Sequence, residues 1–174
     1  MKKESPTLEN FEEIVAEHWQ VVFRTIMGFL HCIEDAEDVT QEVFLKAYKH
    51  RNMFRGESAV ATWLYRIAVN LSLNYISQRR HKAYFPLEER DSNRVVSGDD
   101  PHRQLERKET ESAVRSAIDS LPERQRVAFV LSRYDDLSQK EIATVMKLSE
   151  GAVEQLLQRA KANLSQKLKH SVGK

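Results

Sequence analysis

The chain has 174 residues, of which 41% are hydrophobic and 30% are charged, with 27 Lys and Arg against 26 Asp and Glu. This hydrophobic content is sufficient for a packed core and excludes a chain that is disordered throughout. No apolar stretch approaches the roughly 18–20 residues that cross a bilayer, and the single cysteine excludes an internal disulfide or a Cys-rich zinc site. We therefore expect a cytoplasmic protein with no direct membrane insertion.

The first part of the chain predicts two helices. Apolar residues recur every three or four positions over residues 8–30, and again over residues 36–49. The second of these helices has an apolar face formed by Val39, Val43, Phe44, Ala47 and Tyr48. Five acids and no Lys or Arg lie between residues 31 and 42, so this helix also carries an acidic patch. The patch is either a partner-binding surface or an ordinary solvated helix face.

A third helix is predicted over residues 59–80, within a segment that has no acid from residue 58 to residue 87. Aromatic and basic side chains alternate in and before this helix, among them Phe54, Trp63, Arg66 and Arg79. Rings that stack on bases, together with cations that pair with phosphates, are typical of single-stranded nucleic-acid binding. The alternative is that Trp63 and its apolar neighbours are core residues of a small helical domain.

Residues 86–103 have no apolar periodicity and contain two prolines and five acids, which indicates a linker. The predicted fold is therefore all-α, with two small helical domains, residues 1–85 and 104–174, joined by a flexible acidic linker over residues 86–103. Each half has a size that can fold around one core.

The second domain is expected to end in a helix-turn-helix over residues 138–160. Ser138 and Glu141 have the spacing of a capping box, and Ala143 is small enough for close helix crossing. The apolar anchors are Ile142, Val145, Val153 and Leu156. Lys147 lies where such turns often have Gly, at a cost of about 1 kcal/mol. The candidate duplex-contacting residues are Ser149, Glu150, Glu154, Gln155, Gln158, Arg159 and Lys161. A helical hairpin without a DNA role is the alternative.

Several motifs in one order carry a resemblance to a known family. They are DAEDVTQEVFLKAY, FRGESAVATWLYRIAVN, the basic QRRHK, the acidic linker, SLPERQRVAFVL and LSQKEIATVMKLSEGAVEQLLQRAKANL. Over residues 8–170 the chain resembles a bacterial RNA polymerase sigma factor of the extracytoplasmic-function (group IV) class. Many members of that family have Lys and Arg at the positions of Glu154 and Leu156. The promoter sequence that this chain recognises therefore cannot be copied from that of a relative.

The resemblance implies partners and roles. The partners are core RNA polymerase, through its β′ and β subunits, promoter DNA and a membrane-anchored anti-sigma factor. The acidic helix would grip the β′ coiled coil through Asp38, Gln41 and Glu42. The loop of residues 52–58 would receive a flipped −10 base, and the −10 contacts would come from Phe54, Arg55, Trp63, Arg66, Asn70, Arg79 and Arg80. The helix-turn-helix would read the −35 duplex, and the linker would thread near the polymerase active-site cleft.

Two other classes compete with a sigma factor. An autonomous helix-turn-helix transcriptional regulator would need a self-complementary apolar surface and tight binding to a palindrome. A helical enzyme would need a catalytic constellation, but the six histidines are scattered, none lies in an HExxH motif, and there is no Gly-rich phosphate loop. The acids Glu34, Asp35 and Asp38 have no partnering His for a metal. We therefore expect no catalytic residue, no metal and no cofactor.

Overall fold

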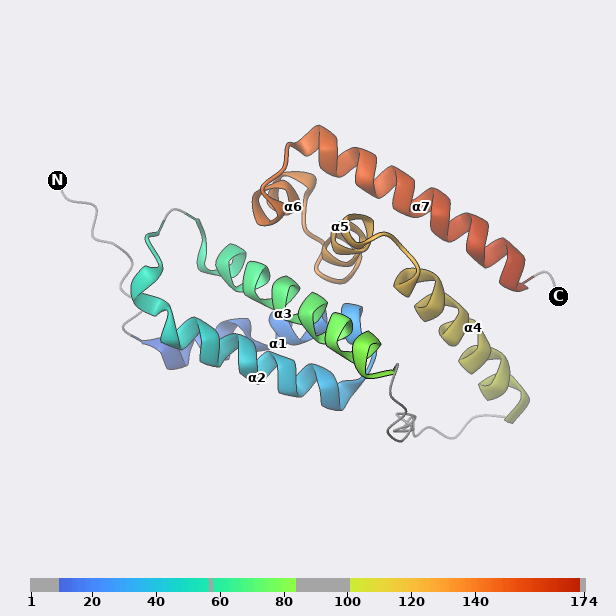
Figure 1. Cartoon of the computed structure of the whole chain (residues 1–174), viewed down its shortest axis with the longest axis horizontal. Helices are drawn as coiled ribbons and strands as arrows, with labels where there is room; N and C mark the ends of the chain where they lie inside the picture. Colours follow the sequence, from blue (N-terminus) through green and yellow to red (C-terminus); the bar gives the residue numbers. More distant parts are fainter. Residues whose placement is uncertain (1–9, 57, 84–100, 173–174) are drawn as a thin grey trace.

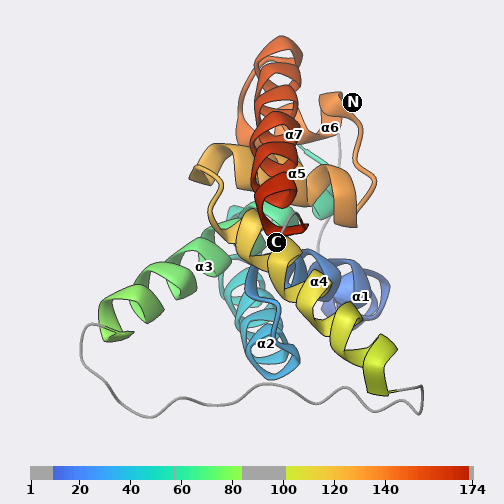
Figure 2. The same ribbon diagram turned by 90° about the vertical axis from the view of Figure 1, so that its right-hand side faces the viewer.

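The computed structural model describes residues 10–56, 58–83 and 101–172, with side chains for residues 10–56, 58–80 and 108–169. Within these ranges all regular structure is helical, which confirms the predicted all-α fold class. The elements are α1 (Phe11–Leu30), α2 (Ile33–Lys49), the 3-10 helix η1 (Arg51–Met53), α3 (Val60–Ala83), α4 (Pro101–Asp119), α5 (Glu123–Tyr134), α6 (Gln139–Met146) and α7 (Glu150–Val172). The first half of the molecule, α1–α3, lies below α5–α7 of the second half in two perpendicular views (Figures 1 and 2). Residues 86–100 of the predicted linker lie outside the described residues.

The periodicity of α2 explains the packing of the first half. Its buried residues recur every three or four positions and face Val22 and Ile26 of α1 and Leu64 of α3; they are Ala36, Val39, Thr40, Val43, Phe44 and Ala47. The expectation that Tyr48 belongs to this apolar face is wrong. Tyr48 is 48% exposed, because it lies in the last turn of α2, where its ring makes only an edge-to-face contact with Phe11.

Local interactions define the helix-turn-helix as predicted. The Ser138 hydroxyl accepts a hydrogen bond from the Glu141 backbone N–H, and the Glu141 carboxylate accepts one from the Ser138 N–H, which confirms the capping box. Lys147 ends α6 in the left-handed conformation, with φ 55°. Of the predicted anchors, Ile142, Val145 and Val153 are buried, whereas Leu156 is half-buried next to the buried Leu157.

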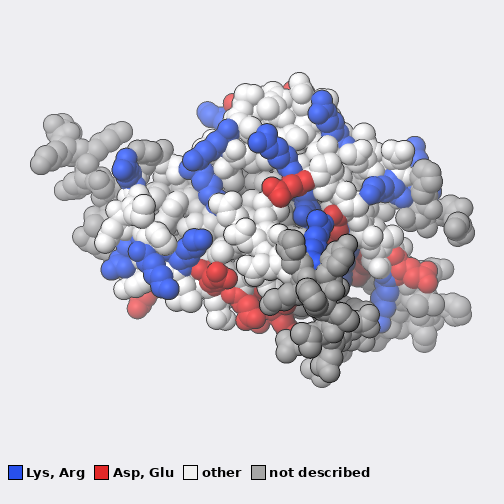
Figure 3. Space-filling view, in the orientation of Figure 1, with Lys and Arg blue, Asp and Glu red and all other residues white. Residues whose placement is uncertain are grey.

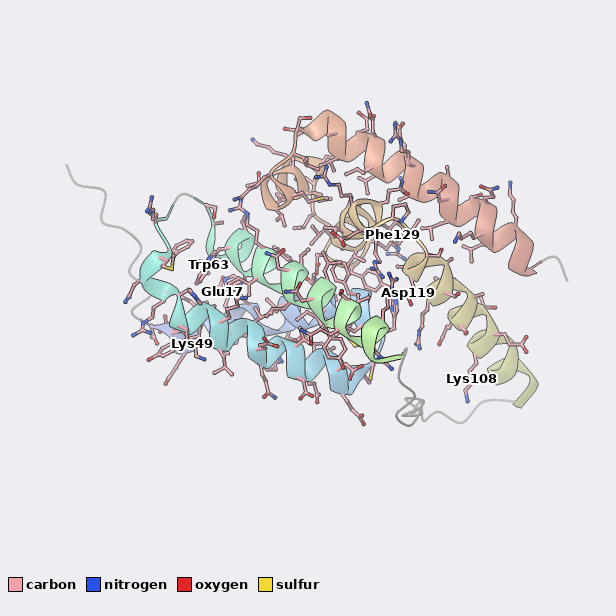
Figure 4. All side chains as sticks on the ribbon, viewed as in Figure 1. Glu17, Lys49, Trp63, Lys108, Asp119 and Phe129 are labelled. Atoms are coloured by element: carbon pink, nitrogen blue, oxygen red, sulfur yellow. The ribbon has the colours of Figure 1, made fainter. Side chains whose placement is uncertain are left out.

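The long helix α7 also supports α4. Ala117, Ile118 and Leu121 form a small core with Ala160 and Leu164 of α7. Close to this core, the Asp119 carboxylate lies 3.4 Å from His31 Nε2 of the first half and 3.5 Å from Arg126 Nη1 of α5 (Figure 4). The end of α4 therefore carries a charge that faces both halves.

One of the apolar clusters contains residues of both halves. Phe29 of α1 and Tyr65 of α3 belong to the same buried cluster as Val130, Leu131 and Ile142 of the second half, a cluster that also includes Val69, Val127, Ala128, Ala143, Val145, Val153 and Leu157. The contact is close because Gly28 has no side chain: a Cβ at that position would lie 2.8 Å from Val130 Cγ1. The halves in this structure are therefore packed directly on each other, α1 against α5 and α3 against α6.

Candidate polymerase and nucleic-acid interfaces

The acidic face of α2, which we define as Asp38, Gln41 and Glu42, points into solvent. Gln41 and Glu42 follow Asp38 by three and four positions, so the three residues share one side of the helix, and all three are exposed. The buried residues of α2 occupy the opposite side. Figure 3 shows acidic side chains gathered along the edge of the molecule where α2 lies. The arrangement offers a negative surface for a basic partner.

Leu45 lies at the end of this acidic face and is not among the residues predicted from the sequence. It follows Asp38 by seven positions and Glu42 by three, and its side chain is 60% exposed. A signal was available, because Leu45 is out of phase with the buried stripe of α2. Buried apolar anchors ringed by polar groups carry much of the energy of protein interfaces. Leu45 therefore adds an exposed apolar side chain at the end of the acidic face.

The aromatic residues that precede and begin α3 come together. The rings of Phe54 and Trp63 are 5.2 Å apart between centroids, and both side chains are half-buried. Figure 4 shows Trp63 near the beginning of α3, next to the loop that joins η1 to this helix. Arg55 is exposed in the same loop, and Gly56 adopts φ 68°, a conformation that suits glycine. The half-buried rings of Phe54 and Trp63 and the exposed cation of Arg55 therefore lie together near the beginning of α3.

The predicted basic residues of α3 do not form one surface. Arg66 and Arg79 are thirteen positions apart, about 20 Å along a helix. Asn70 and Arg80 are exposed, whereas Arg66 donates hydrogen bonds to backbone carbonyls of α6. Arg79 Nη1 instead donates to Asp35 Oδ2 of α2 at 3.0 Å. In this arrangement two of the predicted DNA-binding arginines have protein partners.

Asp35 joins α2 to the end of α3. Besides the ion pair with Arg79, it accepts a hydrogen bond from Tyr75. Burial, followed by this hydrogen bond and the negative charge of Asp35, raises the pKa of Tyr75 to about 12. Asp35 thus has a structural role and is distinct from the exposed acidic face.

The predicted duplex-contacting residues lie along the exposed side of α7 and its preceding turn. All seven are exposed: Ser149, Glu150, Glu154, Gln155, Gln158, Arg159 and Lys161. The Ser149 hydroxyl accepts a hydrogen bond from the Ala152 N–H, so this residue also caps α7. Gln158 donates to the Glu154 carboxylate at 3.3 Å, which orients that acid along the helix. The surface combines amides and carboxylates that suit base edges with two cations that suit phosphates.

The described part of the chain contains neither a membrane span nor a metal-ligand cluster. No helix among them is long and apolar enough to span a membrane. No three His, Cys, Asp or Glu side chains in these ranges come together as a potential metal site. Cys32 is a free, buried thiol.

Comparison with known proteins places both halves in one class. Residues 14–82 match the model of Sigma-70 region 2, and residues 111–164 match that of Sigma-70, region 4. The two matched regions are thus those of a sigma-70-type initiation factor. The chain is 34% identical over 165 residues to the RNA polymerase sigma-H factor of Pseudomonas aeruginosa, covering 91% of this chain and 86% of the relative. It is 37% identical over 141 residues to the ECF RNA polymerase sigma-E factor of Escherichia coli, covering 77% of this chain and 74% of the relative.

A solved structure supports the same fold. The sigma factor RpoE of Bartonella quintana, in complex with the anti-sigma factor NepR, matches with a TM-score of 0.66 at 18% identity over 92% of this chain and 98% of that one. The chain belongs to the ECF family of RNA polymerase sigma factors. As a member of this family it binds core RNA polymerase and promoter DNA and directs transcription initiation. This result favours a sigma factor over an autonomous helix-turn-helix regulator.

Proposed function

We propose that separate surfaces of the chain carry out the successive contacts of initiation. The acidic face of α2 binds the β′ coiled coil of core polymerase, and the second half meets the β subunit. The loop of residues 52–58 and α3 take the flipped base and single strand of the −10 element, through Phe54, Arg55, Trp63, Arg66, Asn70, Arg79 and Arg80. The exposed side of α7 reads the −35 duplex through the seven residues described above.

The observation that carries this proposal is the exposure of the acidic face around Leu45. An exposed apolar side chain one turn after Glu42 has no packing role within its own helix bundle, whereas a basic partner helix would cover it and gain the burial. Near-neutral net charge fits the same view, because polymerase supplies many of the phosphate contacts that an autonomous DNA-binding protein must make itself.

Reconstitution with core polymerase tests the assignment. The wild-type chain is expected to give transcripts from specific members of a genomic promoter library. The double variant Asp38→Arg with Glu42→Arg is expected to lose core binding while keeping its helical circular dichroism, because reversed charge meets a basic partner. Retained core binding by this variant would contradict the assignment of the acidic face, and an absence of promoter-specific transcripts would contradict the function.

Four further properties belong to this proposal. The protein has no enzymatic activity of its own, and its action requires no cofactor or metal. It acts in the cytoplasm, where it meets RNA polymerase. Its activity is restrained by an anti-sigma factor that covers the polymerase-facing surfaces; pull-down from the source cell with the full chain, followed by mass spectrometry, identifies that partner and distinguishes it from core polymerase subunits.

A further inference from the structure

The first turns of α7 carry negative charge where a helix of this kind would enter DNA. From Glu150 to Gln158 the helix contains two acids and no Lys or Arg, and its first cation is Arg159. In a helix-turn-helix, the N-terminal residues of the second helix contact base edges in the major groove. Phosphates repel a carboxylate at this position. The acids of α7 therefore need a hydrogen-bond donor on a base to offset that repulsion.

Glu154 is held in place by a neighbour on the same side of α7. Gln158 lies one turn further along the helix, and its Nε2 donates to Glu154 Oε1 at 3.3 Å. Both side chains are exposed. Because this partner is a neutral amide, the carboxylate keeps its full negative charge. The bond engages one of the two carboxylate oxygens, so the other can accept a hydrogen bond from a ligand.

The chemistry of the major groove decides which base such a carboxylate can bind. Only cytosine, through its N4 amino group, and adenine, through its N6 amino group, present donors there. Guanine and thymine present acceptors, which repel a carboxylate. Adenine also places the acceptor N7 next to its amino group, whereas cytosine presents the amino group alone. A charged carboxylate therefore favours cytosine and disfavours guanine and thymine most strongly.

We propose that Glu154, oriented by Gln158, determines one base of the −35 element by accepting a hydrogen bond from the N4 amino group of a cytosine. This inference rests on the proposed role of α7 in reading the −35 duplex. Gln158 is a positioning residue in this arrangement, because its amide fixes the carboxylate without neutralising it. Glu154 then contributes specificity through the bases that it repels as well as through the base that it binds.

The first experiment selects −35 sequences with holoenzyme reconstituted from core polymerase and the full chain. The library keeps the −10 element of a promoter that the wild-type holoenzyme transcribes and randomises the −35 element. The wild type is expected to select cytosine at one position, where thymine or guanine weakens binding about ten- to hundredfold. Glu154→Ala is expected to lose the preference at that position alone.

Two further variants separate base readout from a general effect of charge. Glu154→Gln is expected to shift the selected base from cytosine to adenine, because an amide pairs with adenine N6 and N7 together. Glu109→Gln is the matched control, since it removes the same charge from an exposed position of α4, outside the helix-turn-helix. This control is expected to select the wild-type −35 sequence.

The second experiment removes the proposed donor atom from the DNA. The selected cytosine is replaced by 2-pyrimidinone, which lacks the N4 amino group, and holoenzyme affinity is measured for both duplexes. The wild type is expected to lose about tenfold more affinity than Glu154→Ala. Weaker base pairing affects both holoenzymes alike, so the difference isolates the contact between N4 and Glu154. Gln158→Ala is expected to reduce this difference, whereas a merely structural role of Gln158 would weaken both duplexes equally.

Two results would overturn the cytosine contact. One is equal loss of affinity by the wild type and Glu154→Ala when the amino group is removed. The other is stronger binding of Glu154→Gln to all −35 sequences alike, because the carboxylate would then act only by repelling phosphates. Both results leave α7 as the reader of a selected −35 sequence. Selection of no −35 sequence by the wild type would instead contradict the proposed role of α7, and this inference with it.

Discussion

Thr25 of α1 and Asp135 at the end of α5 form an O–H···O hydrogen bond of 2.6 Å between residues 110 positions apart in the chain. Both side chains are buried, and burial raises the pKa of the Asp135 carboxyl above its ordinary value, although the hydrogen bonds from Thr25 and Arg24 oppose this shift. Thr25 is the buried donor of this pair, so its hydroxyl stabilises a carboxylate that would otherwise be poorly solvated.

The substitution Thr25→Val is expected to destabilise the chain. It keeps the shape of the side chain but leaves a buried carboxylate with one donor fewer, at a cost of about 1–3 kcal/mol in the free energy of unfolding. Thr40→Val is the matched control, because the buried Thr40 hydroxyl donates only to the Ala36 carbonyl within α2. Urea denaturation at neutral pH measures both. Equal effects of the two substitutions would show that the Thr25–Asp135 bond contributes no special stability.

The capping box of α6 is expected to make stability depend on pH. Hydrogen bonds from Ser138 lower the pKa of the exposed Glu141 carboxyl. Because the folded pKa lies below the unfolded value, this stabilisation is present above about pH 4.3 and is lost as the pH falls through the folded pKa. Ser138→Ala should therefore destabilise the chain at neutral pH, and its difference from the wild type should shrink on acidification. Denaturation curves at a series of pH values check this, and a pH-independent difference would contradict the ionic part of the cap.

Leu45→Ala is expected to weaken core polymerase binding about five- to thirtyfold, or about 1–2 kcal/mol, if Leu45 is an apolar anchor. Ile33→Ala is the control, because Ile33 is 55% exposed on the same helix but lies outside the acidic face. Fluorescence titration of labelled chain with core polymerase gives both affinities. Wild-type affinity for Leu45→Ala, with loss of binding by the Asp38 and Glu42 charge reversal, would remove Leu45 from the interface and leave the acidic face assigned.

The exposed residues of α7 are expected to divide into two kinds. Gln155→Ala should change the base preference at one −35 position, because an amide reads base edges. Lys161→Ala should weaken all −35 sequences alike and reduce the salt dependence of binding by about one unit of slope, because a cation contacts phosphate. Holoenzyme binding to a set of −35 duplexes at several salt concentrations separates the two effects. A uniform loss for Gln155→Ala would contradict base readout.

Most of the helical architecture was predictable because its causes are local. The capping box joins Ser138 and Glu141, which are three positions apart, and the buried residues of α2 recur with the 3.6-residue period of a helix. The left-handed backbone conformation of Lys147 also has a local cause, since the turn between two crossing helices needs a residue in this conformation. The exposed acidic face follows from α2 periodicity, as the complement of its buried side.

The partners of Arg66 and Asp135 were not predictable in this way. Arg66 reaches a carbonyl 78 positions away, and no pattern near residue 66 distinguishes a guanidinium that awaits DNA from one that caps a distant helix. Gly28 likewise has no local signal for its closeness to Val130. These relationships depend on how two amphipathic bundles meet.

The order of residues alone therefore determined the helices, their caps, the helix-turn-helix and the family resemblance, because each depends on hydrogen bonds and apolar periodicity over a few positions. Only the tertiary structure decided that the two halves share a core and that Arg66, Thr25 and Gly28 lie at their junction. The physical reason is that long-range packing selects among many surfaces with similar composition, and it does so through shape and through the pairing of buried polar groups.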